Sequence, residues 1–215
     1  MGKEWIRVLK MKENMQRCLY IIADFSYAEE TIAAVLEAGI DYIQLREKQV
    51  SSAEYLMRAK KLRRMTARYH TKLMINDRLD IAALSNADGV HLGQSDIPIR
   101  DARSFLGAAK IIGATAKTPA QAIKAQEDGA DYLGSGAWFP TSTKRDAVPI
   151  TEETYQAILA ATHIPNIAVG GLTAANCSRP LSLGGNGLAI SAGILASQDP
   201  AAEVKKIRQI LASVI

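Results

Sequence analysis

The chain has 215 residues, of which 48% are hydrophobic, and a formal net charge of +4. This length suffices for a large core in one domain, and no Pro/Gly/Ser-rich linker or shift in composition divides the chain. The apolar runs are too short for a transmembrane helix, and residues 1–17 lack the apolar centre of a secretion signal.

Cysteine content and basic charge narrow the class of protein further. Cys18 and Cys177 are too few for a disulfide framework or a zinc site, so we expect reduced thiols in a cytoplasmic protein. The densest basic cluster, residues 60–64, falls on a predicted helix and is typical of a solvated helix face rather than a nucleic-acid site. We therefore expect small-molecule partners, with no nucleic acid and no membrane. Association into a homo-oligomer is left open.

Short apolar runs alternate with helical patterns along the whole chain. Strands are predicted over residues 18–24, 41–46, 72–76, 89–92, 111–115, 132–136, 166–169 and 187–191. Helices are predicted over residues 27–38, 51–69, 79–85, 119–129, 151–161 and 200–214, with another near Pro98 and an irregular one interrupted by Arg179-Pro180.

These eight strand–helix units predict one α/β fold. Strands that are buried on both faces indicate parallel pairing. Eight strands are more than a doubly wound open sheet of this size usually has, which favours a closed (β/α)8 TIM barrel. We expect a single barrel domain over residues 18–215, preceded by an N-terminal extension over residues 1–17.

In such a barrel the chemistry lies at the carboxyl ends of the strands, and polar residues follow several strands here. The second predicted strand ends in Gln44-Leu45-Arg46-Glu47-Lys48. Period-two alternation places Gln44 and Arg46 on one face of the sheet. A buried arginine is costly unless it meets an anion. That anion is either a bound ligand or the partner in a structural ion pair.

The third and fourth strands bring acidic residues to the same end. Asn76-Asp77 follows one strand, and Asp96 follows the next. Two carboxylates beside basic side chains suit a Mg²⁺ ion shared with a polyphosphate. Each aspartate taken alone is also typical of a helix cap or a turn. His91, within the fourth strand, is interpreted as a packed residue rather than a catalytic base.

Three later strand ends favour a phosphate site. Gly134 in the sixth strand marks a close backbone approach. The loop after Pro140 then carries hydroxyls and an ammonium, which suit phosphate oxygens, although an ordinary turn has the same composition. These loop residues are Thr141, Ser142, Thr143 and Lys144. Gly170-Gly171 and Ile190-Ser191 follow the seventh and eighth strands, where barrels of this kind often bind phosphate through backbone N–H groups.

Five segments in this order resemble thiamine phosphate synthases: residues 44–48, 75–78, 89–96, 139–144 and 168–172. The resemblance implies a transferase of thiamine biosynthesis. It would join 4-amino-2-methyl-5-hydroxymethylpyrimidine pyrophosphate to 4-methyl-5-(2-phosphoethyl)thiazole, giving thiamine phosphate and pyrophosphate. It departs from the family at three places. Thr115 stands where the family often has serine, residues 184–187 read Gly-Gly-Asn-Gly, and residues 1–17 extend beyond the family core, so Met11 or Met15 is an alternative start.

The resemblance also implies roles for individual residues. Catalysis is assigned to Arg46, Lys48 and Lys144, and Mg²⁺ binding to Asp77 and Asp96. The pyrimidine pyrophosphate would contact Gln44, Leu45, Arg46, Glu47, Lys48, Asn76, Thr115 and Lys144. The thiazole phosphate would contact Thr141, Ser142, Thr143, Gly171, Ile190 and Ser191.

Three other functions compete with this one. A thiazole tautomerase of the related branch tends to lack the Asn76-Asp77 and Thr141–Lys144 elements, so their presence disfavours it. A phosphosugar epimerase or isomerase would need a clear acid–base pair at the strand ends. A non-catalytic binder of thiamine intermediates is left open.

Overall fold

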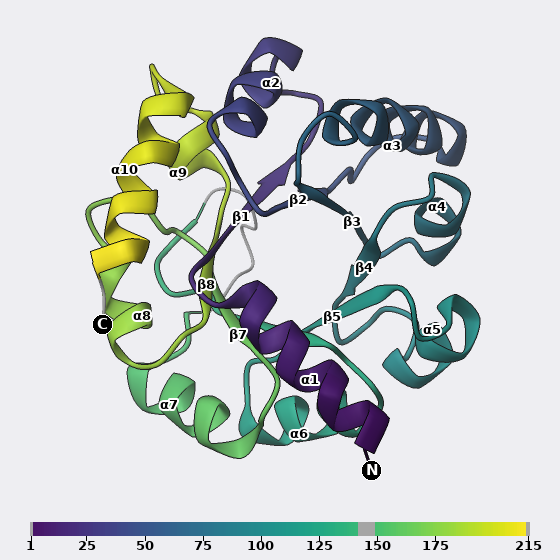
Figure 1. The fold of residues 1–215 in the computed structure, drawn as a ribbon, viewed down its shortest axis with the longest axis vertical. Coiled ribbons are helices and arrows are strands. Elements are labelled where there is room, and N and C mark those ends of the chain that lie inside the picture. Colours follow the sequence, from purple (N-terminus) through teal and green to yellow (C-terminus); the bar gives the residue numbers. More distant parts are fainter. Residues whose placement is uncertain (1, 142–148, 214–215) are drawn as a thin grey trace.

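The strands close into one parallel barrel, as the alternating pattern predicts. The computed structural model describes residues 2–141 and 149–213, with side chains from residue 7. Each strand pairs with the next in sequence, and the first pairs with the last (Figure 1). The strands are β1 Cys18–Ala23, β2 Tyr42–Leu45, β3 Lys72–Asn76, β4 Gly89–Leu92, β5 Ile111–Thr115, β6 Tyr132–Ser135, β7 Asn166–Val169 and β8 Gly187–Ile190.

Helices surround the barrel as an outer layer (Figure 1). Ser51 caps α3, since its Oγ accepts a hydrogen bond from the backbone N–H of Glu54 at 3.2 Å. Among the described residues, no helix is both long and apolar enough to cross a bilayer. The helices are α1 Gly2–Met15, α2 Glu29–Glu37, α3 Ser52–Thr66, α4 Leu79–Leu84, α5 Ile99–Leu106, α6 Pro119–Glu127, α7 Glu152–Ala161, α8 Ser178–Ser182, α9 Ala192–Leu195 and α10 Pro200–Ser213.

Alternation along each strand divides the apolar side chains into two layers. Ile43 and Leu45 of β2 pack outward, in a cluster shared with the surrounding helices. Tyr42 of the same strand packs inward, in a second cluster with residues of other strands such as Tyr20 and Tyr132. The side chain of Gln44 has the same parity as Tyr42 and is buried inside the barrel. Polar groups inside the barrel therefore come from alternate positions of the strands.

The N-terminal segment contains a helix that the sequence pattern did not predict. Helix α1 precedes β1 and runs across the barrel in Figure 1. Its Met11 and Met15 are buried in the same inner cluster as Tyr20 and Tyr132. The helix therefore covers the amino-terminal end of the barrel and packs against the side chains that fill it.

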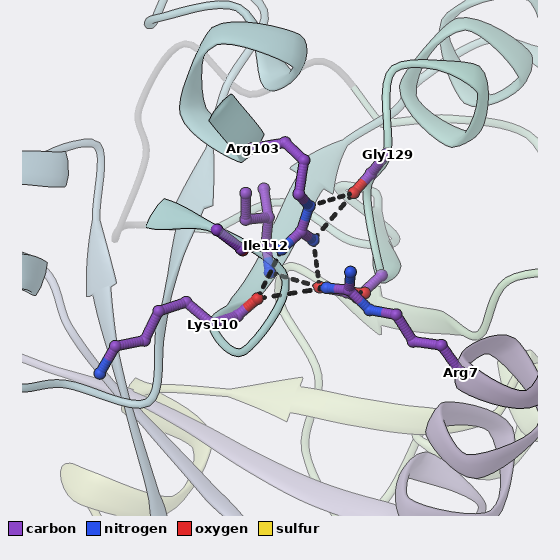
Figure 2. A network of polar contacts seen from close by, with 7 residues as sticks. Arg7, Arg103, Lys110, Ile112 and Gly129 are labelled. Atoms are coloured by element: carbon purple, nitrogen blue, oxygen red, sulfur yellow. Dashed lines mark hydrogen bonds and ion pairs between the residues drawn. The ribbon is translucent and has the colours of Figure 1, made fainter. Parts of the chain in front are cut away.

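A polar network fastens α1 to the barrel (Figure 2). Asp131, directly before β6, is 6% exposed, and its carboxylate lies 2.7 Å from Arg7 of α1 and 2.6 Å from Arg103 of α5. It also accepts a hydrogen bond from the backbone N–H of Ile112 at 2.7 Å. Arg103 also donates two hydrogen bonds to the carbonyl oxygen of Gly129. One carboxylate thus joins α1, α5, β5 and β6 at the end of the barrel opposite the strand carboxyl ends.

Candidate active site

A cavity of about 770 Å³ opens at the carboxyl ends of the strands. The barrel brings the polar strand ends together there, as the sequence analysis expected. Residues from the loops after β2, β3 and β4 line one part, and residues from the loops after β6, β7 and β8 line another. The predicted site residues that line it are Gln44, Arg46, Lys48, Asn76, Asp77, Asp96, Thr115, Thr141, Gly171, Ile190 and Ser191.

The side chains of Leu45 and Glu47 do not line this cavity. Leu45 points outward and is fully buried in the layer between the barrel and the helices. The Glu47 carboxylate accepts from the backbone N–H of Phe25 at 3.1 Å and pairs with Arg58 at 2.8 Å. Both side chains thus support the fold, and their predicted contact with the pyrimidine pyrophosphate stays a prediction. Ser142, Thr143 and Lys144 lie outside the described residues.

Two carboxylates and an ammonium meet at one end of the cavity. Asp77 has a left-handed backbone (φ 64°), and its carboxylate pairs with Nζ of Lys48 at 3.1 Å. Asp96 accepts a hydrogen bond from the backbone N–H of Gly93 at 2.6 Å. Burial and a side-chain hydrogen bond with Asp77 raise the pKa of Asp96 above its ordinary value. The predicted convergence of the two aspartates is therefore present.

This acidic pair has the composition of a magnesium site that a substrate completes. Two carboxylates within hydrogen-bond reach of each other suit a cation that is shared between them. Within the described part of the chain, no group of three or more His, Cys, Asp or Glu residues is placed to hold a metal. Mg²⁺ commonly takes one or two carboxylates and fills its other positions with phosphate and water oxygens. Asp77 and Asp96 fit that pattern.

The loops after β7 and β8 form another wall of the cavity. Gly171 has φ 66°, and a Cβ at this position would lie 2.7 Å from the carbonyl oxygen of Pro140. The side chain of Asn176 braces this loop, donating to the Gly171 carbonyl at 3.1 Å and accepting from the N–H of Thr173 at 2.8 Å. Ser191 directly precedes α9 and faces the same cavity. A small hydroxyl and a glycine backbone without a side chain suit a phosphate.

The deepest part of the cavity holds a chain of hydrogen bonds that sequence reasoning missed. Nε2 of Gln44 donates to the Tyr20 hydroxyl at 2.8 Å, and the hydroxyls of Tyr20 and Tyr132 lie 2.9 Å apart. Nδ1 of His91 is 3.0 Å from the Tyr132 hydroxyl, and its Nε2 is 3.0 Å from Oγ1 of Thr115. We call these five residues the floor chain. Alternation along the strands, already used for Gln44, was the signal that could have found the tyrosines.

His91 belongs to this chain as a neutral ring. Burial lowers the pKa of His91 to about 4. Its ring packs against that of Tyr132, with centroids 5.5 Å apart, and each ring nitrogen has a hydroxyl partner. These contacts support the interpretation of His91 as a packed strand residue, and the expectation that it does not act as a base stays a prediction.

Comparisons with known proteins agree on one family. The family model described as thiamine monophosphate synthase matches residues 19–194. The chain is 42% identical over 202 residues to a thiamine-phosphate synthase of Clostridioides difficile, covering 91% of this chain and 96% of that protein. It is 38% identical over 191 residues to a thiamine-phosphate synthase of Methanobrevibacter smithii, with 87% and 91% covered.

A solved structure points to the same family, and a second one shares the fold. A thiamine phosphate pyrophosphorylase from Pyrococcus furiosus superposes with a TM-score of 0.86 at 32% identity, covering 95% of this chain and 98% of that one. A 3-hexulose-6-phosphate synthase superposes with a TM-score of 0.69 at 17% identity, covering 90% and 99%, and this likeness concerns the fold alone.

Proposed function

Since this chain belongs to the thiamine monophosphate synthase family, we propose that its cavity joins 4-amino-2-methyl-5-hydroxymethylpyrimidine pyrophosphate to 4-methyl-5-(2-phosphoethyl)thiazole. The products are thiamine phosphate and pyrophosphate, and the enzyme is a transferase of thiamine biosynthesis. Its proposed partners are these small molecules, with no nucleic acid and no membrane, and its proposed compartment is the cytoplasm. Both cysteines are free and buried, in keeping with a reducing compartment.

The observation that carries this proposal is that one cavity combines two different groups of residues suited to anions. The end with Lys48, Asp77 and Asp96 combines a cation with a carboxylate pair and suits a pyrophosphate with its metal. The wall with Gly171 and Ser191 suits a single phosphate. The floor chain between the strands provides hydrogen bonds for a heterocycle. A reaction between two phosphorylated heterocycles uses all three parts.

The proposed bond changes balance without an added oxidant or base. The bond between the pyrimidine methylene carbon and the pyrophosphate oxygen breaks, and its electron pair leaves with pyrophosphate. The lone pair of the thiazole nitrogen then forms a bond to that carbon, and the nitrogen becomes a cation. No proton has to leave either reactant, which agrees with the neutral, fully bonded state of His91.

We assign the positive side chains to the departing group. Arg46 and Lys48 line the cavity, Lys48 in an ion pair with Asp77, and both would hold pyrophosphate oxygens as negative charge grows on them. Lys144 is proposed for the same task, from a loop outside the described residues. Asp77 and Asp96 would hold Mg²⁺, which when bound neutralises charge on the pyrophosphate. Asn76 and Thr115 would contact the pyrimidine pyrophosphate, and Thr141, Ser142 and Thr143 the thiazole phosphate.

The test is incubation of the purified chain with both phosphorylated precursors and Mg²⁺, followed by chromatography and mass spectrometry. We expect thiamine phosphate to form only when both precursors are present, with one pyrophosphate released per product. Binding of both precursors without product would identify a non-catalytic binder instead.

A further inference from the structure

The hydrogen bonds of the floor chain all donate in one direction, which follows from the donors and acceptors of its residues. It connects Gln44 on β2 with Thr115 on β5, through Tyr20, Tyr132 and His91. Gln44, Tyr20 and Tyr132 are each at most 2% exposed. Buried hydroxyl and amide groups are costly without partners, so each proton along the chain needs an acceptor.

The series of donated hydrogen bonds begins at Gln44, because an amide nitrogen can only donate. The Tyr20 oxygen accepts from Nε2 of Gln44, which leaves its own proton for the Tyr132 oxygen. The Tyr132 hydroxyl therefore donates to Nδ1 of His91. A neutral imidazole then carries its proton on Nε2, which donates to Oγ1 of Thr115. Every proton along the chain has an acceptor in this arrangement.

The two ends of the chain face the cavity with opposite character. With Nε2 engaged, Gln44 has its Oε1 left as an acceptor, and this oxygen has no hydrogen-bond partner among the described residues. Thr115 accepts from His91 and keeps its own proton as a donor. The pyrimidine substrate has a matching pair of groups, since its amino group donates and its pyrophosphate oxygens accept.

We propose that Tyr20, Tyr132 and His91 are positioning residues that hold the Gln44 amide with its oxygen toward the amino group of the pyrimidine. This inference rests on the proposed function and adds to it the source of selectivity for an aminopyrimidine. Without the Tyr20 hydroxyl the amide can turn over, and its NH₂ group would then face the amino group of the ligand. Tyr132 does not contact Gln44. Its hydroxyl accepts the proton of Tyr20, so that this proton does not point at the Gln44 amide.

The test measures selectivity rather than activity. Calorimetry without the thiazole partner gives Kd for the pyrimidine pyrophosphate and for its deamino analogue, in which hydrogen replaces the amino group. The variants are Tyr20→Phe and Tyr132→Phe, each of which removes one hydroxyl from the floor chain. Tyr42→Phe is the matched control, because Tyr42 stacks on Tyr20 with centroids 5.5 Å apart but takes no part in the hydrogen bonds of the floor chain.

We expect Tyr20→Phe and Tyr132→Phe to reduce the preference for the amino compound about fivefold, the effect of one neutral hydrogen bond, while Tyr42→Phe leaves it unchanged. If Tyr20→Phe does not fold, Tyr132→Phe decides alone, since its hydroxyl makes no contact with Gln44. Equal weakening of both ligands, or an unchanged preference in both variants, would overturn the inference. Failure of the unaltered protein to make thiamine phosphate would instead overturn the proposed function.

Discussion

Replacing Asp131 by asparagine should destabilise the barrel strongly while leaving its chemistry intact. The carboxylate is 6% exposed and is shared by Arg7, Arg103 and the N–H of Ile112 (Figure 2). Burial lowers the pKa of Arg103, so this guanidinium depends on its acidic partner. Asp131→Asn keeps the shape of the side chain, removes the charge and replaces one acceptor oxygen by a donor NH₂ group.

The expected loss of unfolding free energy depends on the partners that the two arginines keep in the variant. Removing one partner of a buried ion pair typically costs about 3–5 kcal/mol. Arg103 keeps hydrogen bonds to the carbonyls of Gly107, Lys110 and Gly129, and Arg7 is 32% exposed. Both facts favour the lower end, about 3 kcal/mol, which for a chain of this length lowers Tm by roughly 6–12 °C.

The assay is denaturant unfolding at 25 °C together with kcat for thiamine phosphate formation. Arg7→Met is the matched comparison: it keeps the packing of the stem, removes a partly exposed ion pair, and should cost only about 1 kcal/mol. Both variants should keep the kcat of the unaltered protein, because Asp131 lies at the opposite end of the barrel from the cavity. A loss below about 1 kcal/mol for Asp131→Asn, or a kcat that falls while the protein stays folded, would refute this reasoning.

The other predictions concern the cavity. Asp77→Asn and Asp96→Asn should each lower turnover strongly and raise the Mg²⁺ concentration that gives the half-maximal rate. Full activity of both variants in the presence of a chelator would contradict the metal assignment. Lys144→Ala should reduce kcat with little change in Tm, whereas normal turnover with early melting would make the lysine structural. Ser191→Ala should raise KM for the thiazole phosphate about fivefold, equivalent to about 1 kcal/mol, and leave KM for the pyrimidine pyrophosphate unchanged. Ser95→Ala, a cavity serine in the loop after β4, is its control, and equal losses in the two KM values would show that the phosphate subsite is wrongly placed.

Strands were easier to predict than helices in this chain because their signals are local. Short apolar runs predicted all eight strands to within two residues at each end. Helix α1 mixes apolar residues with many charged ones, and its Met11 and Met15 make tertiary contacts that no local pattern contains. Pro180 interrupts a helical pattern, but it lies in the first turn of α8, where its missing N–H removes no helical hydrogen bond.

The candidate site was predictable to the extent that it follows strand ends. The residues after β2, β3 and β4 had to meet once the barrel closed, and alternation correctly placed Gln44 and Arg46 on the cavity side. The contact between Tyr20 and Tyr132 joins residues 112 positions apart, on strands that are not neighbours in the barrel. Period-two alternation predicts that both tyrosines point inward, but not that their hydroxyls meet. That depends on how far each ring reaches across the interior.

Two glycines explain how the barrel interior has room for the floor chain. A Cβ at Gly113 would lie 2.2 Å from Cζ of Tyr132, and one at Gly134 would lie 2.9 Å from Cε1 of His91. The Tyr132 ring therefore lies over a position without a side chain on the neighbouring strand β5, and the His91 ring lies over such a position on β6, two strands away. The close approach predicted at Gly134 is thus the approach of His91, a polar ring, and not only the packing of two backbones. Glycine weakens a strand, but at these two positions it leaves room for rings that carry hydrogen-bonding groups. The floor chain can therefore form inside a barrel whose interior is otherwise apolar.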